Sequence, residues 1–105
     1  MKYVILDANG HKLPIIFPEA LNHDFVASAM KLVVVVQAPK FKGAVTVFGA
    51  GFTDPLVIAV HGKSETLNIE SKSSDLPYLA LGSAIAHMPP DAAMAMFTAI
   101  TGKKP

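Results

Sequence analysis

Cysteine is absent from this chain of 105 residues, and so are arginine and tryptophan. Without cysteine there can be no disulfide, no thiolate metal site and no cysteine nucleophile. All nine basic residues are lysines, so the planar guanidinium fork that usually reads phosphate and guanine is missing. The formal net charge of +1 provides no field that would steer nucleic acid toward the protein. We therefore expect no nucleic-acid partner.

Charged side chains are scarce: they make up 16% of the chain, whereas 51% of the residues are hydrophobic. An average globular domain has about 25% charged residues. This length corresponds to one domain, residues 1–105. Because a domain this small has much surface for its volume, some apolar side chains should stay outside the core of a monomer. The composition favours a homo-oligomer or a complex with another protein, and a compact monomer with few charges is the alternative.

Long apolar runs are missing as well. No run approaches the ~20 residues of a membrane-spanning helix. The longest candidate, Leu76 to Met88, is interrupted by Gly82 and His87. The apolar N-terminal run is too short for a signal peptide, and Asp7 follows it directly. We expect a protein that has no membrane partner and is not secreted by the ordinary route.

The chain does contain a strand-rich stretch, residues 44–71. Residues 45–48 and 67–70 can place alternate side chains on two faces, as half-buried strands do. Residues 56–60 form a continuous apolar run, which is typical of a strand covered on both faces. The glycines of residues 49–51 predict a bulge. The stretch therefore predicts a three-stranded meander at the centre of a sheet, with turns at Asp54-Pro55 and Gly62-Lys63-Ser64.

Asn9-Gly10 lies between two apolar runs, residues 3–6 and 13–17, which is a strong signal for a hairpin. Pro14 cannot donate a hydrogen bond to a neighbouring strand, so the second strand is expected at an edge or to be distorted there. An apolar edge suits pairing with another subunit, which makes Pro14 and Ile16 interface candidates.

A helical pattern runs from Pro18 to about Lys31, with His23 and Asp24 on its polar side. The β-branched run of residues 32–36 predicts another buried strand. Near the C-terminus, Ser74 or Asp75 can cap a helix that ends near His87, and a second helix covers residues 92–101. These helices pack either on the core or on another chain; their interface candidates are Met88, Met94, Met96 and Phe97. The expected fold class is α+β: an antiparallel-rich sheet of five or six strands, one inserted helix and two C-terminal helices within about residues 74–102.

Patterns for catalysis and metal binding are weak. The histidines, at positions 11, 23, 61 and 87, have no metal-binding spacing, so we expect no metal site and no cofactor. His61 and Ser64 lie close together and Asp75 follows, but there is no GxSxG elbow around the serine. A hydroxyl that satisfies backbone in a turn is the simpler interpretation of Ser64. A small hydrolase that uses His61 and Ser64 is therefore the weakest hypothesis.

Three segments carry a pattern of their own: IFPEALNHDFVA at 16–27, GAGF at 49–52 and HGKSETLNIESKSSD at 61–75. They resemble a family of short, uncharacterised proteins of tailed phages and prophages, over roughly residues 3–80. The matching residues are Phe17, Pro18, Glu19, His23, Ala50, Gly51, Phe52, Gly62, Ser64, Leu67, Ser71 and Asp75. The chain departs from that pattern at Gly49, where the family has serine, and at Ser73-Ser74, where it often has Arg-Pro. The resemblance implies a phage-associated protein and no defined activity.

Composition and resemblance together predict a non-enzymatic binding or assembly protein that self-associates and acts on a host or phage protein, in the host cytoplasm or the virion. A virion structural subunit, for head decoration or as a connector, is the alternative, and the small hydrolase is the third hypothesis. The identity of the partner, the oligomeric state and the role of the C-terminal helices stay open at this point.

Overall fold

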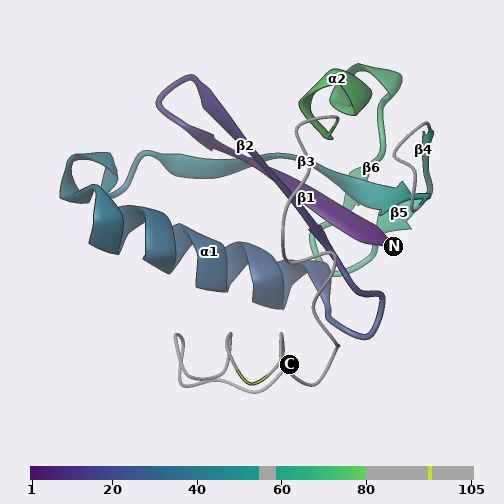
Figure 1. Ribbon diagram of the computed structural model, residues 1–105, viewed down its shortest axis with the longest axis horizontal. Helices are drawn as coiled ribbons and strands as arrows, with labels where there is room; N and C mark the ends of the chain where they lie inside the picture. The colour runs from purple at the N-terminus through teal and green to yellow at the C-terminus, as the bar shows by residue number, and fades with distance from the viewer. Residues whose placement is uncertain (55–58, 80–94, 96–105) are drawn as a thin grey trace.

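The computed structural model describes residues 1–54, 59–79 and 95. Within them the fold is α+β, as expected, and its sheets are antiparallel (Figure 1). Four strands form one sheet in the order β2-β1-β3-β4, and β5 and β6 form a small second sheet. The elements are β1 (Lys2–Ala8), β2 (His11–Phe17), α1 (His23–Gln37), β3 (Val45–Thr53), β4 (Val60–His61), β5 (Lys63–Ser64), β6 (Ile69–Glu70) and α2 (Leu76–Leu79), with 3₁₀ turns at Pro39–Phe41 and Ser73–Asp75. The described strands are thus divided between two sheets, where the sequence predicted one sheet of five or six strands.

The β1–β2 hairpin is confirmed. Asn9 and Gly10 both have positive φ, at 53° and 92°, as the turn of a two-residue hairpin requires. The Asp7 carboxylate accepts a hydrogen bond from the Gly10 amide at 2.7 Å. In the described part of the chain β2 forms the edge of the larger sheet, and Pro14 lies opposite Ile5 on β1. The edge position expected from Pro14 is therefore correct.

The strand that is covered on both faces is β1, which lies between β2 and β3. Val4 and Leu6 belong to the hydrophobic cluster under α1. Tyr3 and Ile5 belong to a second cluster on the other face, together with Leu79 of α2. Helices α1 and α2 accordingly lie on opposite sides of the strands (Figure 1). We predicted that the meander of residues 44–71 provides the centre of the sheet, and this is wrong, because β1 lies between β2 and β3 and pairs with both. Residues 55–58 of the expected middle strand lie outside the described residues.

Strand β3 contains the expected irregularity. Ile5 pairs with Gly49 and Leu6 pairs with Val47, so Phe48 is an extra residue in the ladder. The strand does not end at the glycines but continues to Thr53. A Cβ at Gly49 would lie 2.8 Å from Oδ1 of Asp75, which explains why this position has no side chain.

The run Leu32–Val36 is helical and forms the second half of α1, where the sequence predicted a buried strand. A continuous apolar run has no hydrophobic periodicity, so its sequence pattern cannot distinguish a strand from a helix. The preceding helix determines the conformation of this run, because adding residues to a helix that has already formed costs little free energy. Valine lowers the stability of a helix only slightly. The helix ends at Gln37, since Ala38 precedes Pro39.

The β5–β6 hairpin and the start of the C-terminal part also differ in detail from the sequence analysis. Lys63 and Ser64 form a short strand where a turn was expected, and Leu67 lies in the following turn because only Ile69 and Glu70 pair back. A helix begins after Asp75, as expected, with α2 at Leu76–Leu79. The rest of the two predicted C-terminal helices lies outside the described residues.

Candidate functional site

The second half of α1 exposes aliphatic side chains. None of the five residues from Leu32 to Val36 is buried; 45% of Leu32 and 72% of Val36 is exposed. We call these five residues the aliphatic end of α1. A groove of about 250 Å³ is lined there by Leu32, Val33, Val36 and Gln37. A helical turn that is apolar all round is normally covered, so this surface is a candidate for contact with another protein.

The interface candidates from the sequence are placed as follows. Pro14 is half-buried on the edge strand β2. Ile16 is only 3% exposed and packs with Tyr3, Ile5 and Leu79, so its side chain contributes to the core. Met88, Met94, Met96 and Phe97 lie outside the described residues. The sequence analysis missed Leu32 and Val36, which an uninterrupted helical pattern from His23 to Gln37 would have identified.

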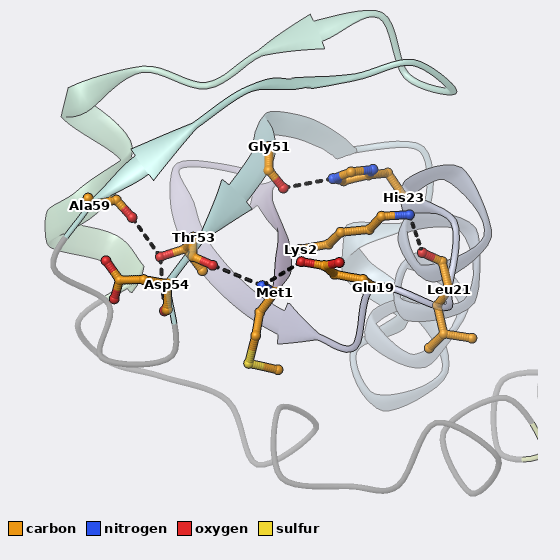
Figure 2. A network of polar contacts seen from close by, with 9 residues as sticks. All are labelled: Met1, Lys2, Glu19, Leu21, His23, Gly51, Thr53, Asp54 and Ala59. Carbon is orange, nitrogen blue, oxygen red and sulfur yellow. Dashed lines mark hydrogen bonds and ion pairs between the residues drawn. The ribbon is translucent and has the colours of Figure 1, made fainter.

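His23, the first residue of α1, is 3% exposed, which corrects its expected place on the polar side of the helix. Its Nε2 lies 2.8 Å from the Gly51 carbonyl oxygen (Figure 2). Since a carbonyl only accepts, Nε2 carries the proton that is donated. Phe17 and Phe52 contact the ring edge-on, with centroids at 5.5 Å in each case. Burial lowers the pKa of His23, so the imidazole is neutral at physiological pH and Nδ1 is an acceptor.

A pocket of about 120 Å³ lies beside this ring. It is lined by Lys2, Asn22, His23, Phe52, Lys63, Glu65 and Thr66, and we call it the His23 pocket. The lining comes from the start of β1, the N-terminus of α1, the end of β3 and the β5–β6 hairpin. Nζ of Lys2 donates to the Leu21 carbonyl oxygen at 2.8 Å, which holds this ammonium group at the pocket (Figure 2).

A second polar pair is buried on the opposite face of the sheet. The Tyr3 hydroxyl donates to Oδ2 of Asp75 at 2.6 Å, and both side chains are 0% exposed. The Lys72 amide donates to the same oxygen at 3.2 Å. Oδ1 of Asp75 is buried and has no hydrogen-bond partner among the described residues. Burial, followed by the hydrogen bond to Asp75, raises the pKa of Tyr3. This pair ties the segment that leads into α2 to the central strand β1.

The residues of the hydrolase hypothesis occupy different environments. Ser64 is 0% exposed, and its hydroxyl accepts a hydrogen bond from the Leu67 amide at 3.2 Å, as the simpler interpretation of Ser64 predicts. His61 is exposed and stacks on Phe52 with centroids 5.7 Å apart. Within residues 1–54, 59–79 and 95, no group of three His, Asp or Glu side chains is placed to hold a metal ion. The hydrogen bond to Leu67 gives the Ser64 hydroxyl a structural role.

No helix in the described ranges is long and apolar enough to cross a bilayer. The chain was also compared with protein-family models, with curated proteins and with solved structures, and none of them matches. Its function is therefore argued from its own geometry.

Proposed function

We propose that this protein is a non-enzymatic, phage-associated binding or assembly module that self-associates through the aliphatic end of α1. The observation that carries the proposal is the exposure of Leu32 and Val36 on a helical segment of five successive aliphatic residues. Each Å² of apolar surface removed from water stabilises a complex by about 25 cal/mol. Contact with another protein is the ordinary way to remove such a surface from water.

A second copy of this chain is the partner that fits the surface best. Residues 32–39 contain no charged side chain, so two copies of the aliphatic end of α1 would meet without like-charge repulsion. A twofold axis brings the same patch of each subunit together, which an uncharged aliphatic surface permits. A stable interface needs about 800 Å² from each partner, so neighbouring surface must contribute as well.

The C-terminal part of the chain supplies that additional surface in our proposal. The sequence predicts two helices within about residues 74–102, and we propose that Met88, Met94, Met96 and Phe97, whose flexible or aromatic side chains suit an interface, contribute to it. The association with phages rests on the resemblance of the segments 16–27, 49–52 and 61–75. On that basis the protein acts on a host or phage protein in the host cytoplasm, or forms part of the virion as a structural subunit.

The test is a measurement of mass by light scattering over a wide range of concentrations. The unmodified chain should associate, and Leu32→Lys combined with Val36→Lys should give a folded monomer. Ser28→Lys, which adds a charge at an exposed position in the first half of α1, is the matched control and should leave association intact. Circular dichroism verifies the fold of each variant. A monomer at every concentration, or association that survives the double change, contradicts the proposal.

A second measurement separates the two phage roles. Detection of the protein among the proteins of purified virions would support the structural subunit. Its absence from virions, together with binding to a host protein, would support the host-directed role.

A further inference from the structure

The His23 pocket has the size of a small anionic group. Its volume of about 120 Å³ leaves room for several water molecules or for one small ion. Four separate segments of the chain form its walls, so its shape is fixed by the fold and not by one loop. It lies at the α1 N-terminus and away from the aliphatic end of α1, so an inference about it is independent of the proposed self-association.

The charges around the pocket are unbalanced. Lys2 and Lys63 each bring a positive charge, and Glu65 is the one acidic residue among the described residues of the lining. Neither lysine forms an ion pair within the described part of the chain. The Lys2 ammonium group uses one of its three hydrogens on Leu21, which leaves two for a ligand. Two lysines that line one pocket and form no ion pair in the described part of the chain would attract an anion.

The remaining walls restrict what else can bind. The His23 ring is held in place by its contacts with Gly51, Phe17 and Phe52. Because the imidazole is neutral, it adds no positive charge to the pocket. In the first turn of α1, the Asp24 amide already donates to Thr66 Oγ1 at 3.2 Å and the Phe25 amide to Asp24 Oδ1 at 2.8 Å. The helix N-terminus adds a partial positive charge, and the nearby Asp24 carboxylate opposes it.

We propose that the His23 pocket binds a phosphate group, held by the ammonium groups of Lys2 and Lys63. Lysine binds phosphate as a point charge, so the absence of arginine from this chain does not prevent it. The ligand is either free inorganic phosphate or the phosphate of a small monoester. Phosphate suits the site because its charge matches the two ammonium groups.

The test is an NMR titration of the full chain with inorganic phosphate, at constant ionic strength maintained with sodium chloride. The ring signals of His23 and Phe52 report on the pocket directly. We expect saturable shifts at these two rings. Lys63→Gln should weaken binding by roughly fivefold to tenfold, because it removes one charge-assisted contact. Glu65→Gln should strengthen binding by roughly threefold, since it removes the opposing charge.

Two further variants complete the experiment. Lys42→Gln removes the same charge from an exposed position that does not line the pocket, and binding should stay within roughly twofold of the unmodified chain. Lys2→Gln should weaken binding as Lys63→Gln does, but it also removes the contact with Leu21, so Lys63 is the decisive position. Methyl phosphate is titrated in parallel. If it binds more tightly than inorganic phosphate, the ligand is a monoester; if it binds equally, the pocket accepts both; if only the inorganic ion binds, the ligand is the free ion.

Three results would overturn the proposal. The first is the absence of saturable shifts at His23 and Phe52. The second is a set of shifts that sodium chloride alone reproduces. The third is an affinity that Lys63→Gln and Lys42→Gln lower equally, because this would mean that net charge, and not the pocket, attracts the ion.

Discussion

The hydrogen bond between Tyr3 and Asp75 should contribute measurably to stability, and Tyr3→Phe tests this. The change removes the hydroxyl that donates to Oδ2 of Asp75 at 2.6 Å and leaves the ring in place. Oδ2 then keeps the Lys72 amide at 3.2 Å as its donor, while Oδ1 already has no partner among the described residues. A buried carboxyl group that loses one hydrogen-bond donor should destabilise the fold, since water does not reach it to replace the Tyr3 hydroxyl.

The magnitude follows from the burial of the pair. Leaving a buried acceptor short of a partner costs about 1–3 kcal/mol, and both side chains here are 0% exposed. We expect Tyr3→Phe to lower the free energy of unfolding by about 2 kcal/mol, which corresponds to roughly 8–16 °C in Tm for a domain of this size. Urea denaturation followed by circular dichroism measures the first quantity, and a thermal scan measures the second.

Tyr78→Phe is the matched control for this prediction. Tyr78 is half-buried, and its ring contacts Phe48 edge-on with centroids at 5.5 Å, a contact that phenylalanine keeps. Its loss of stability should stay below about 0.5 kcal/mol. In a double-mutant cycle with Asp75→Asn, the coupling to Tyr3→Phe should reach about 1 kcal/mol. Equal stabilities of the Tyr3→Phe and Tyr78→Phe variants would refute the reasoning.

The same pair predicts a dependence of stability on alkaline pH. Burial and the hydrogen bond to Asp75 raise the pKa of Tyr3 above its ordinary value of 10.0. Above pH 10.0 the unfolded chain loses the phenol proton while the folded chain keeps it. Stability must then fall as the pH rises, by at most about 1.4 kcal/mol per pH unit from this group. The Tyr3→Phe variant should lack this contribution, so a slope equal to that of the unmodified chain would contradict the assignment.

Three further predictions concern other parts of the fold. Burial lowers the pKa of His23 from 6.5, so below that pH the unfolded chain binds a proton that the folded chain does not, and stability should fall as the pH drops. His23→Gln should remove most of this loss, and the exposed His61→Gln should not. Urea denaturation at several pH values measures both effects. Gly49→Ala should cost about 1–3 kcal/mol, because the added Cβ meets Asp75 at 2.8 Å, and the cost measured by urea denaturation should shrink in an Asp75→Ala background. Val36→Ala should raise the helix content and stabilise a dilute monomer by about 0.5 kcal/mol, since alanine is a better helix former than valine. A clear loss of stability, measured by thermal denaturation, would argue against the helix at this position.

Several features of the fold could be predicted because their causes are local. The Asn9-Gly10 turn needs two residues with positive φ, and the sequence supplies the preferred pair. The bulge at Phe48–Gly49 lies where glycine weakens a regular strand. The helix that begins at Leu76 follows polar residues that can cap it. In each case, a few adjacent residues determine the backbone conformation.

Other features could not be predicted because they depend on distant contacts. The apolar run Tyr3–Leu6 is as continuous as many buried strands, yet its place at the centre follows from pairing with β3, more than forty residues away. His23 is polar by type, and its burial depends on a carbonyl oxygen of β3 that no local pattern indicates. The His23 pocket likewise draws on four separate segments. The β-branching of the Leu32–Val36 run predicts a strand, whereas the continuity of the preceding helix makes the run helical.

Residues from the segments 16–27 and 61–75 pack around one part of β3, residues 49–52. His23 bonds to the Gly51 carbonyl on one side, and Gly62 lies so close to Phe52 that a Cβ there would be 2.8 Å from the ring. On the other side, a Cβ at Gly51 would lie 2.7 Å from the Cβ of Ser71, and Asp75 fills the space over Gly49.

The packing at Gly51 and Gly62 depends on glycine, because a larger residue at either position would displace these neighbours. Packing of that kind specifies a fold and leaves the chemistry of the protein open. The aliphatic end of α1 contains none of these packing residues, whereas the His23 pocket shares His23 and Phe52 with them. The packing around residues 49–52 keeps the sheet, α1 and the segment leading into α2 together, and it also positions His23 and Phe52 in the wall of the proposed binding pocket.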